Sequence, residues 1–289
     1  MSRLFRWIGY TAGTLAAIVV VAVVVVWVVS ERRISRRRVV PVEHIAVSRD
    51  SATLARGNHL VAILGCSGCH GKQLQGKVMF DDFRLARLVA PNLTERIRRY
   101  SDDSLAHVIR DGVNSEGRGV LAMPSSVFYN LSNADIGAII AALRTRPSVA
   151  SDSLLPPNAY RLLGRVGIAT GRFKPEPEFI DRTTPRLGER GDTTRLGRGE
   201  YLAKTSCIEC HGPDLRGGDG TPSLAGAYGY ALDEFVRLAR TGTPREARPL
   251  TMMEGIARDR LAHMSDTELA DLYEYLRAIP PQSSRAAVR

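Results

Sequence analysis

Two pentapeptides in this chain combine side chains that could bind a redox cofactor. Residues 66–70 read Cys-Ser-Gly-Cys-His, and residues 207–211 read Cys-Ile-Glu-Cys-His. In a C-x-x-C-H sequence the two thiols add to the vinyl groups of haem, and the adjacent imidazole binds the iron. The motifs therefore predict two covalently bound haem c groups, attached through Cys66, Cys69, Cys207 and Cys210, with His70 and His211 as iron ligands.

The cysteine count argues against three other interpretations. The chain has four cysteines, and the two motifs use all of them. A zinc ribbon also uses paired C-x-x-C, but it gives no reason for a histidine directly after each second cysteine. A thioredoxin-like C-x-x-C is expected once, beside a βαβ pattern that this sequence does not show. Structural disulfides would leave both histidines without a role.

The second half of the sequence repeats the first. The segment R-G-N-H-L at residues 56–60 precedes the first motif as R-G-E-Y-L at residues 198–202 precedes the second. A P-x-L element follows each motif, at Pro91 and at Pro222. At a constant offset of 130 positions, Leu105, Arg110, Gly112, Arg118 and Met123 correspond to Phe235, Arg240, Gly242, Arg248 and Met253. Two similar domains are therefore expected.

This order of parts resembles the class I, mitochondrial-type cytochrome c fold, and the pair resembles the membrane-bound dihaem cytochromes c of bacteria. The resemblance covers residues from about 52 to 147 and from about 195 to 280. It implies an all-α fold with a small helical domain around each haem and a methionine from a later loop as the sixth iron ligand. It also implies that the carbonyl groups of Pro91 and Pro222 accept the Nδ1 proton of the proximal histidines.

Each half offers candidates for the sixth ligand. In the first half Met123 lies just before the last expected helix, whereas its rival Met79 follows the attachment motif closely. In the second half the constant offset selects Met253, and the adjacent Met252 is the next candidate. A core role for these methionines stays open, as does ligation by His263, although a surface position suits that histidine better.

Residues 8–29 form an uncharged run of 22 residues dominated by valine. As a helix this run would span about 33 Å, which is enough for the hydrocarbon core of a bilayer. Trp7 and Trp27 lie near its two ends, where interfacial aromatic residues are enriched. The run is too long for a signal peptide, and no typical cleavage site follows it. We therefore predict a single-pass anchor in the cytoplasmic (inner) membrane.

Two arguments about orientation conflict. Two arginines precede the apolar run and five follow it closely, which by the positive-inside rule would place the C-terminal side in the cytoplasm. The bacterial family that the chain resembles attaches haem on the outer side of that membrane, and large domains translocate largely regardless of charge. We therefore expect the N-terminus in the cytoplasm and both haem domains in the periplasm.

The formal net charge of +10 is unevenly distributed. Residues 1–50 hold 8 arginines against 3 acidic residues, a net +5 and half of the excess. The first haem domain carries most of the remainder, which favours an acidic partner reached through electrostatic steering. Arg118 and Arg248, at matching positions, are candidates for pairing with haem propionates. Nucleic acid is not expected as a partner, because the sequence has no basic stripe interleaved with aromatic residues.

These features divide the chain into five parts. They are an anchor with a basic juxtamembrane segment (1–50), a first cytochrome c domain (51–149), a linker (150–195), a second cytochrome c domain (196–280) and a tail (281–289). Ser132 and Ser265 are expected to cap the last helix of each domain. Whether the proline-containing linker wraps both domains or acts as a hinge stays open. His44, His59 and His107 are expected to face solvent.

The sequence predicts an electron-transfer protein rather than an enzyme, because histidine and methionine on each iron would leave no open coordination position. Its donor would be a dehydrogenase or a quinol-oxidising complex, and its acceptor an oxidase, a reductase or a soluble cytochrome of a respiratory chain. An alternative is the cytochrome subunit of a membrane dehydrogenase acting on an alcohol or sugar acid. A dihaem peroxidase would need an open iron position, and a haem-based sensor would need an output domain.

Overall fold

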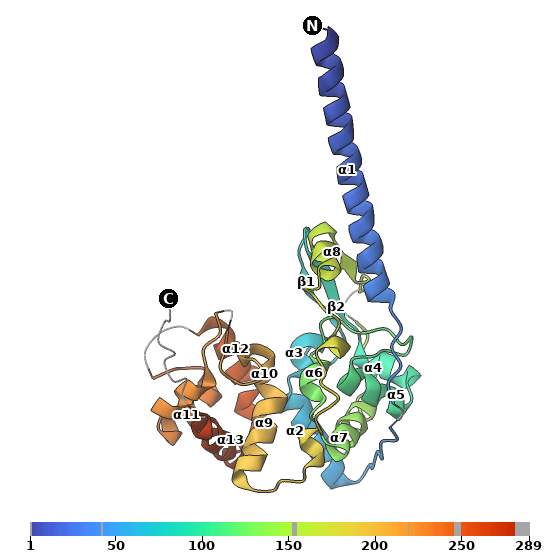
Figure 1. The fold of residues 1–289 in the computed structure, drawn as a ribbon. Helices are drawn as coiled ribbons and strands as arrows, with labels where there is room; N and C mark the ends of the chain where they lie inside the picture. The colour runs from blue at the N-terminus through green and yellow to red at the C-terminus, as the bar shows by residue number, and fades with distance from the viewer. Residues whose placement is uncertain (1, 42, 152–154, 219, 246–249, 281–289) are drawn as a thin grey trace.

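The computed structural model describes residues 2–280 except 42, 152–154, 219 and 246–249. Arg248, predicted to pair with a propionate, lies outside the described residues, as does the expected tail. The described chain has a long N-terminal helix that extends away from two clusters of short helices (Figure 1).

The N-terminal helix α1 (Ser2–Ser35) is longer than the predicted apolar run at both ends. Its 34 residues span about 51 Å at 1.5 Å per residue. Among the described residues it is the one helix long and apolar enough to cross a membrane, and none of its most apolar stretch is buried against the protein. The basic residues after the apolar run do not all face outward, because the Arg33 guanidinium donates to the Ile168 carbonyl and Arg38 forms an ion pair with Glu178.

In the first half of the protein (51–149), the first and last helices cross in close contact. Its helices are α2 (Ser51–Ile63), α3 (Cys66–His70), α4 (Leu93–Arg96), η1 (Ile97–Arg99), α5 (Asp102–Ala106), the π-helix η2 (His107–Asp111), α6 (Ser125–Phe128) and α7 (Asn133–Arg144). A Cβ atom on Gly57 of α2 would lie 1.9 Å from the Ala138 carbonyl oxygen of α7. Glycine is therefore needed for the close contact of the two helices.

The second half (196–280) uses the same arrangement. Its helices are α9 (Arg195–Ser206), α10 (Ile208–His211), η5 (Leu224–Gly229), α11 (Leu232–Thr241), α12 (Thr251–Asp259), η6 (Leu261–His263) and α13 (Asp266–Ala278). Gly199 of α9 takes the place of Gly57, since its Cβ atom would lie 2.1 Å from the Asp271 carbonyl oxygen of α13. The internal repeat that the sequence predicts is thus present in three dimensions.

The last helix of each half begins directly after the serine that was predicted to cap it. The Ser132 hydroxyl accepts from the Asp135 amide at the start of α7, and the Ser265 hydroxyl accepts from the Glu268 amide at the start of α13. Arg110 then binds the Asn133 side chain at 2.7 Å, as Arg240 binds the Asp266 side chain at 2.8 Å. In each half, an arginine from the middle of the sequence thereby fixes the start of the last helix.

The all-α expectation is incomplete, because the structure contains a small antiparallel sheet. Its order is β1 (Lys77–Asp81), β2 (Ala86–Ala90) and β3 (Ala159–Tyr160). Val89 pairs with Val78 in this hairpin, and β3 comes from the linker. β-Branched and aromatic residues at positions 78, 80 and 89 favour extended structure, and they lie in the stretch between the first motif and Pro91.

The linker segment is bound along the first half of the protein. After β3 it forms α8 (Leu162–Ala169), η3 (Glu176–Glu178) and η4 (Leu187–Glu189). The Glu176 carboxylate accepts from the Ser126 amide and hydroxyl, and Arg182 forms an ion pair of 2.6 Å with Asp111. The Gly188 amide donates to the Asn130 carbonyl. These contacts bind the linker to the first half and argue against a free hinge there, but they do not show it wrapped around both domains.

Candidate functional site

His70 ends the short helix α3 with its ring fixed by a backbone group. The Nδ1 atom lies 2.9 Å from the carbonyl oxygen of Pro91. Because a carbonyl can only accept, Nδ1 carries the proton and Nε2 keeps its lone pair. Burial lowers the pKa of His70, against a smaller opposing effect of the Pro91 carbonyl. A neutral imidazole with a free Nε2 is the form that binds a metal.

His211 repeats this geometry at the end of α10. Its Nδ1 atom lies 2.8 Å from the carbonyl oxygen of Pro222. The turns that connect each histidine to its proline also match: Leu74 and Leu215 have φ angles of 61° and 60°, in a region that branched L-residues rarely adopt. Two independent segments thus reproduce the same unusual backbone, which holds the histidine and the proline carbonyl together.

A large cavity opens beside the first motif. It has a volume of about 900 Å³ and is lined by Cys66, Cys69, His70, Met79 and Met123, among others. This volume lies within the range of about 300–1,000 Å³ that is typical of cofactor pockets. Both thiols, the imidazole and a thioether therefore meet in a space that a macrocycle could fill.

Other parts of the chain complete the cavity wall. Arg118, the candidate propionate partner, lines the cavity. Its half-exposed side chain also pairs with Glu116 at 3.4 Å. Ile34, in the last turn of α1, lines it as well, and Arg260 reaches it from the second half. The first site is therefore built from three regions that are far apart in sequence.

Cys66, Cys69 and Cys207 are half-buried and Cys210 is exposed, and none of the four forms a disulfide. Burial raises the pKa of Cys66 to about 11 and that of Cys207 to about 12. The described residues contain no group of three or more histidine, cysteine, aspartate or glutamate side chains that could hold a metal ion. The thiols of the two motifs therefore do not converge as they would in a zinc ribbon.

Arg260 joins the two motifs. A Cβ atom on Gly65, directly before Cys66, would lie 2.0 Å from the Nε atom of Arg260. The Nη1 atom of Arg260 lies 3.3 Å from the carboxylate of Glu209, which is inside the second motif. The positive charge of Arg260 acts on all four thiols, since it opposes the burial-driven rise in the pKa of each one. The two attachment motifs are thus neighbours across one arginine side chain.

The methionine candidates differ in their surroundings. Met123 and Met253 are half-buried against the hydrophobic core, whereas the side chain of Met252 is 76% exposed. Met264 is fully buried beside the cap of α13, as Leu131 is beside the cap of α7. Met253 lies on the first turn of α12 rather than in a loop, so the second half differs here from the implied pattern.

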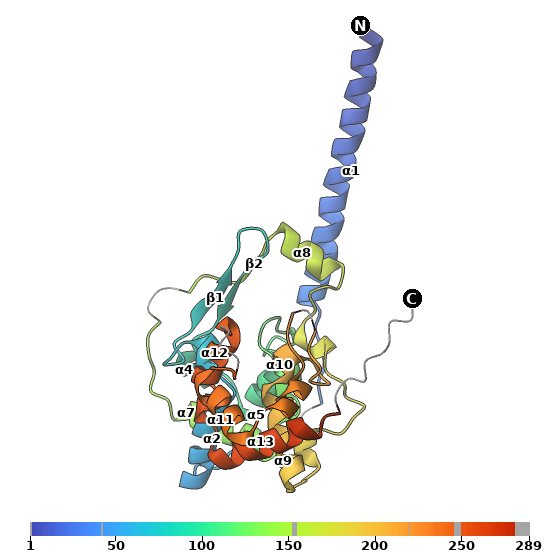
Figure 2. The ribbon, with the colours of Figure 1, turned by 90° about the vertical axis from the view of Figure 1, so that its left-hand side faces the viewer.

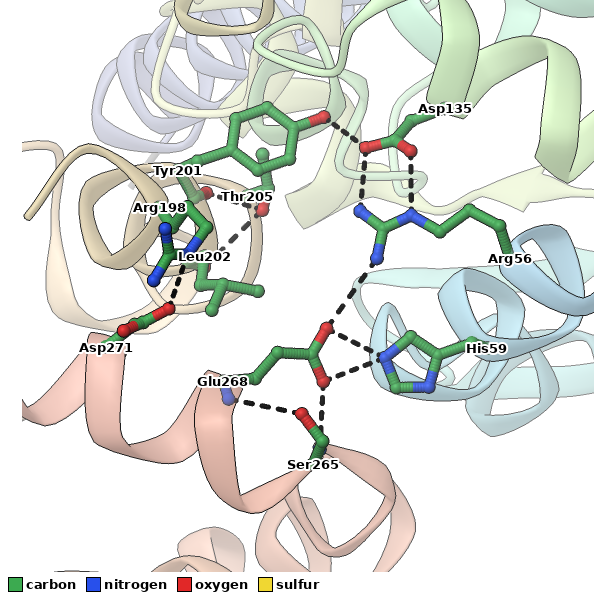
Figure 3. A network of polar contacts seen from close by, with 10 residues as sticks. All are labelled: Arg56, His59, Asp135, Arg198, Tyr201, Leu202, Thr205, Ser265, Glu268 and Asp271. Atoms are coloured by element: carbon green, nitrogen blue, oxygen red, sulfur yellow. Dashed lines mark hydrogen bonds and ion pairs between the residues drawn. The ribbon is translucent and has the colours of Figure 1, made fainter. Parts of the chain in front are cut away.

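The two halves meet in a polar network with approximate two-fold symmetry (Figure 3). The hydroxyl of Tyr201, on α9, donates to Asp135, the third residue of α7, at 2.7 Å. His59, which matches Tyr201 in the repeat, contacts Glu268, the third residue of α13, at 2.9 Å. Arg56 pairs with Asp135 at 2.9 Å and reaches Glu268 at 3.6 Å. The first helix of each half therefore binds the last helix of the other.

Two of the three histidines expected to face solvent do not. His59 lies in the interface just described, and the His107 side chain is 16% exposed and contacts Asp111. The partner of His59, Glu268, is brought near only by the fold, whereas His107 and Asp111 are four residues apart, a local pair that the sequence could have indicated. His44 is 88% exposed, as expected, and His263 lies at the surface.

Sequence reasoning also missed Arg260, Asp135 and Tyr201. Asp135 lies in the first turn of the helix that Ser132 was expected to cap, and its carboxylate accepts from Arg56 and Tyr201. Burial, and then the charge of Asp135, raise the pKa of Tyr201, so the phenol stays protonated and can donate. The match of Tyr201 with His59 in the repeat was the available signal. Arg260 has no matching arginine in the first half, so the repeat gave no signal for it.

Comparison with known protein families places both motifs in cytochrome c segments. Residues 52–141 match the family described as cytochrome C oxidase, cbb3-type, subunit III. Residues 196–280 match the family described as cytochrome c. A search of curated proteins found no match to the chain. Cytochrome c domains imply covalently bound haem c and electron transfer, and the N-terminal apolar helix could span a membrane.

Proposed function

We propose that this protein, with its two cytochrome c segments, is a membrane-bound dihaem c-type cytochrome. It carries single electrons between a donor and a terminal acceptor at the periplasmic face of the cytoplasmic membrane. Bound haem supplies an iron that gains and loses one electron. The chain itself attaches, orients and insulates that group.

In this proposal each side chain at the sites has one role. Cys66 and Cys69 attach the first haem and Cys207 and Cys210 the second. His70 and Met123 bind the first iron, and His211 and Met253 the second. The carbonyl groups of Pro91 and Pro222 hold the imidazole rings in one tautomer and make them better electron donors. Arg118 pairs with a propionate, and we assign the same role to Arg248 by its matching position.

The observation that carries the proposal is the junction at Arg260. One guanidinium contacts Gly65, next to the first motif, and Glu209, within the second. The polar network around Asp135 and Glu268 fixes the same relative position of the two halves. Two redox groups held by neighbouring motifs suit transfer in series, because transfer within the chain then requires no diffusional encounter.

A respiratory role is supported by the first family match. The matched family is a subunit of a terminal oxidase by its description, and the helix α1 could hold the protein at a membrane. We propose that the donor is a dehydrogenase or a quinol-oxidising complex and that the acceptor is an oxidase, a reductase or a soluble cytochrome.

A second candidate function is that of a resident subunit in a larger oxidoreductase. The match to an oxidase subunit favours this function. The larger complex would then be an oxidase or a membrane dehydrogenase that acts on an alcohol or sugar acid. Gentle solubilisation of the membrane separates the two functions. A catalytic chain that stays with the cytochrome in fixed ratio identifies a subunit, and a cytochrome isolated alone yet oxidised by soluble carriers identifies a shuttle.

The dihaem proposal is tested by counting haem in single-motif variants. Intact mass and a haem assay on the full-length protein should give two haems per chain. Cys66→Ser/Cys69→Ser and Cys207→Ser/Cys210→Ser should each keep one haem, and each should lose electron transfer through the chain. One haem per chain in the unaltered protein would contradict the proposal.

A further inference from the structure

An exposed apolar surface lies where the β1–β2 turn meets the start of α8. Its main residues are Phe83, Leu162 and Leu163, with exposed fractions of 79%, 54% and 50%. We call these three residues the apolar foot. Large apolar side chains that gather on an exposed surface mark a site of contact with a membrane or a partner.

The turn and the helix that carry the apolar foot are joined by their backbones. The Leu163 amide donates to the Arg84 carbonyl at 3.1 Å, and the Arg161 amide donates to the Leu85 carbonyl at 3.0 Å. Gly164 lies so near that its Cβ atom would be 2.0 Å from the Leu85 carbonyl oxygen. The foot is therefore a single unit rather than two separate loops.

Helix α8 is in turn attached to the membrane helix. The Arg165 guanidinium stacks over the Trp27 ring at 5.0 Å, pairs with Glu31 at 3.1 Å and donates to Ser30 at 2.9 Å. These three partners lie where the apolar run of α1 ends. Figures 1 and 2 both show α8 beside the lower part of α1, with the end of the β1–β2 hairpin next to α8. The foot therefore lies level with the end of the apolar run.

Exposed arginines flank the apolar foot along the chain. Arg84 follows Phe83 and Arg161 precedes Leu162, and Arg32, Arg36 and Arg172 are exposed at or just beyond the ends of α1 and α8. Apolar side chains flanked by arginines are typical of segments that lie at the boundary between lipid headgroups and acyl chains. Arginine side chains near an anionic membrane surface are attracted to its phosphates.

We propose that the apolar foot rests in the interfacial region of the same bilayer that α1 spans, with its arginines on the phosphates of anionic phospholipids. This inference rests on the proposed membrane anchoring. Lipid is the occupant because the foot is continuous with α1 and level with the end of its apolar run. Since Met79 of β1 also lines the first cavity, the contact sets the position of that cavity relative to the membrane.

Photo-crosslinking of the full-length holoprotein tests the proposal. The photoreactive p-benzoylphenylalanine replaces Phe83 or Leu163, and the protein is reconstituted in nanodiscs of phosphatidylethanolamine and phosphatidylglycerol. Two matched positions serve as references: Val20, 62% exposed on α1, and Leu232, 43% exposed on α11. After irradiation, mass spectrometry detects lipid adducts.

We expect lipid adducts at positions 83 and 163 in several-fold higher yield than at position 232. If position 20 gives lipid adducts but positions 83 and 163 give no more than position 232, or give protein adducts instead, the membrane contact of the apolar foot is wrong and the anchoring by α1 stands. Absence of adducts at position 20 would overturn the anchoring and the foot together.

The charge contribution is tested by Arg84→Glu/Arg161→Glu, with Arg190→Glu as control. The double variant should lower the yield in anionic discs, and an unchanged yield would overturn the phosphate contact.

Discussion

The Arg260 guanidinium lies 3.3 Å from the Glu209 carboxylate, and only 16% of the arginine side chain is exposed. Glu209 occupies the third position of the second motif, and Gly65, which the same arginine contacts, directly precedes the first. A partly buried cation thus lies between the two attachment motifs. Because desolvation strengthens electrostatic interactions, this charge should act on both redox centres.

We predict that Arg260→Leu lowers the reduction potentials of both haems. A nearby positive charge disfavours the oxidised iron, so its removal favours oxidation. With an effective dielectric constant of about 20 and partial compensation by Glu209, the change is on the order of 30–60 mV. Spectroelectrochemical titration of the full-length protein measures it. Arg258→Leu, which removes a largely exposed arginine two positions earlier in the chain, should leave both potentials unchanged. Equal effects of the two variants would refute the role of Arg260.

The methionine assignments predict a contrast between neighbours. Met253→Ala should abolish the methionine-to-iron charge-transfer band of one ferric haem and lower its potential by on the order of 0.1 V, because axial ligands set haem potentials over a range of about 0.8 V. Met252→Ala should change neither, since that side chain is mostly in solvent. The reverse result would assign the ligand to Met252.

The same comparison separates the two candidates in the first half. Met123→Ala should remove the band of the first haem, and Met79→Ala should retain it. Met79 lines the same cavity from β1, so its removal is expected to affect packing alone. Loss of the band only in Met79→Ala would transfer the role of ligand to the hairpin.

Asp135 should stabilise the contact between the halves. Its side chain, 11% exposed, accepts from Arg56 and Tyr201. Asp135→Asn should lower the free energy of unfolding by about 2–4 kcal/mol, because it removes the closer of the two carboxylates that pair with Arg56 and leaves only the 3.6 Å contact with Glu268. Tyr201→Phe, which keeps the ion pair, should cost about 1 kcal/mol. Urea unfolding measures both, and equal effects would contradict the importance of the ion pair.

Glu268 should make the interface sensitive to acid. Burial acts to raise the pKa of Glu268, but the hydrogen bond from the Ser265 amide and the contact with His59 outweigh it, so the pKa lies below its ordinary value. A lowered pKa stabilises the folded state above the unfolded value of about 4.5, and this stabilisation is lost as the pH falls through the folded value. Glu268→Gln should therefore be less stable than the parent at neutral pH and should approach it at strongly acid pH. A constant difference in melting temperature would contradict this.

Local sequence signals were sufficient for the parts of the sites that lie close together in the chain. The C-x-x-C-H spacing and the serine caps each involve residues a few positions apart, and the contacts of Pro91 and Pro222 with the histidines were implied by the family resemblance. Their geometry follows from local backbone preferences, and the internal repeat gave each element a second, independent example. The matching φ angles of Leu74 and Leu215 show how closely the repeat is reproduced.

The contacts between the halves could not be predicted in this way. Arg260 and Gly65 are separated by nearly two hundred positions, and no periodic pattern links them. His59 was expected in solvent because its partner Glu268 belongs to the other half of the protein. The β1–β2 hairpin was missed since the family resemblance implied helices only, although its extended residues have β-forming side chains.

The central claim, that electrons pass between the two sites within one chain, is tested most directly by flash photoreduction. In a variant with Met123→His, which separates the two potentials, a light pulse on an added flavin, with a sacrificial amine as the electron donor, reduces a fraction of the haems. Absorbance then follows their re-equilibration. We expect a phase whose rate does not depend on protein concentration and in which the second haem gains the electrons that the first loses. A rate proportional to protein concentration would mean that electrons move only between molecules, and it would contradict transfer across the Arg260 junction.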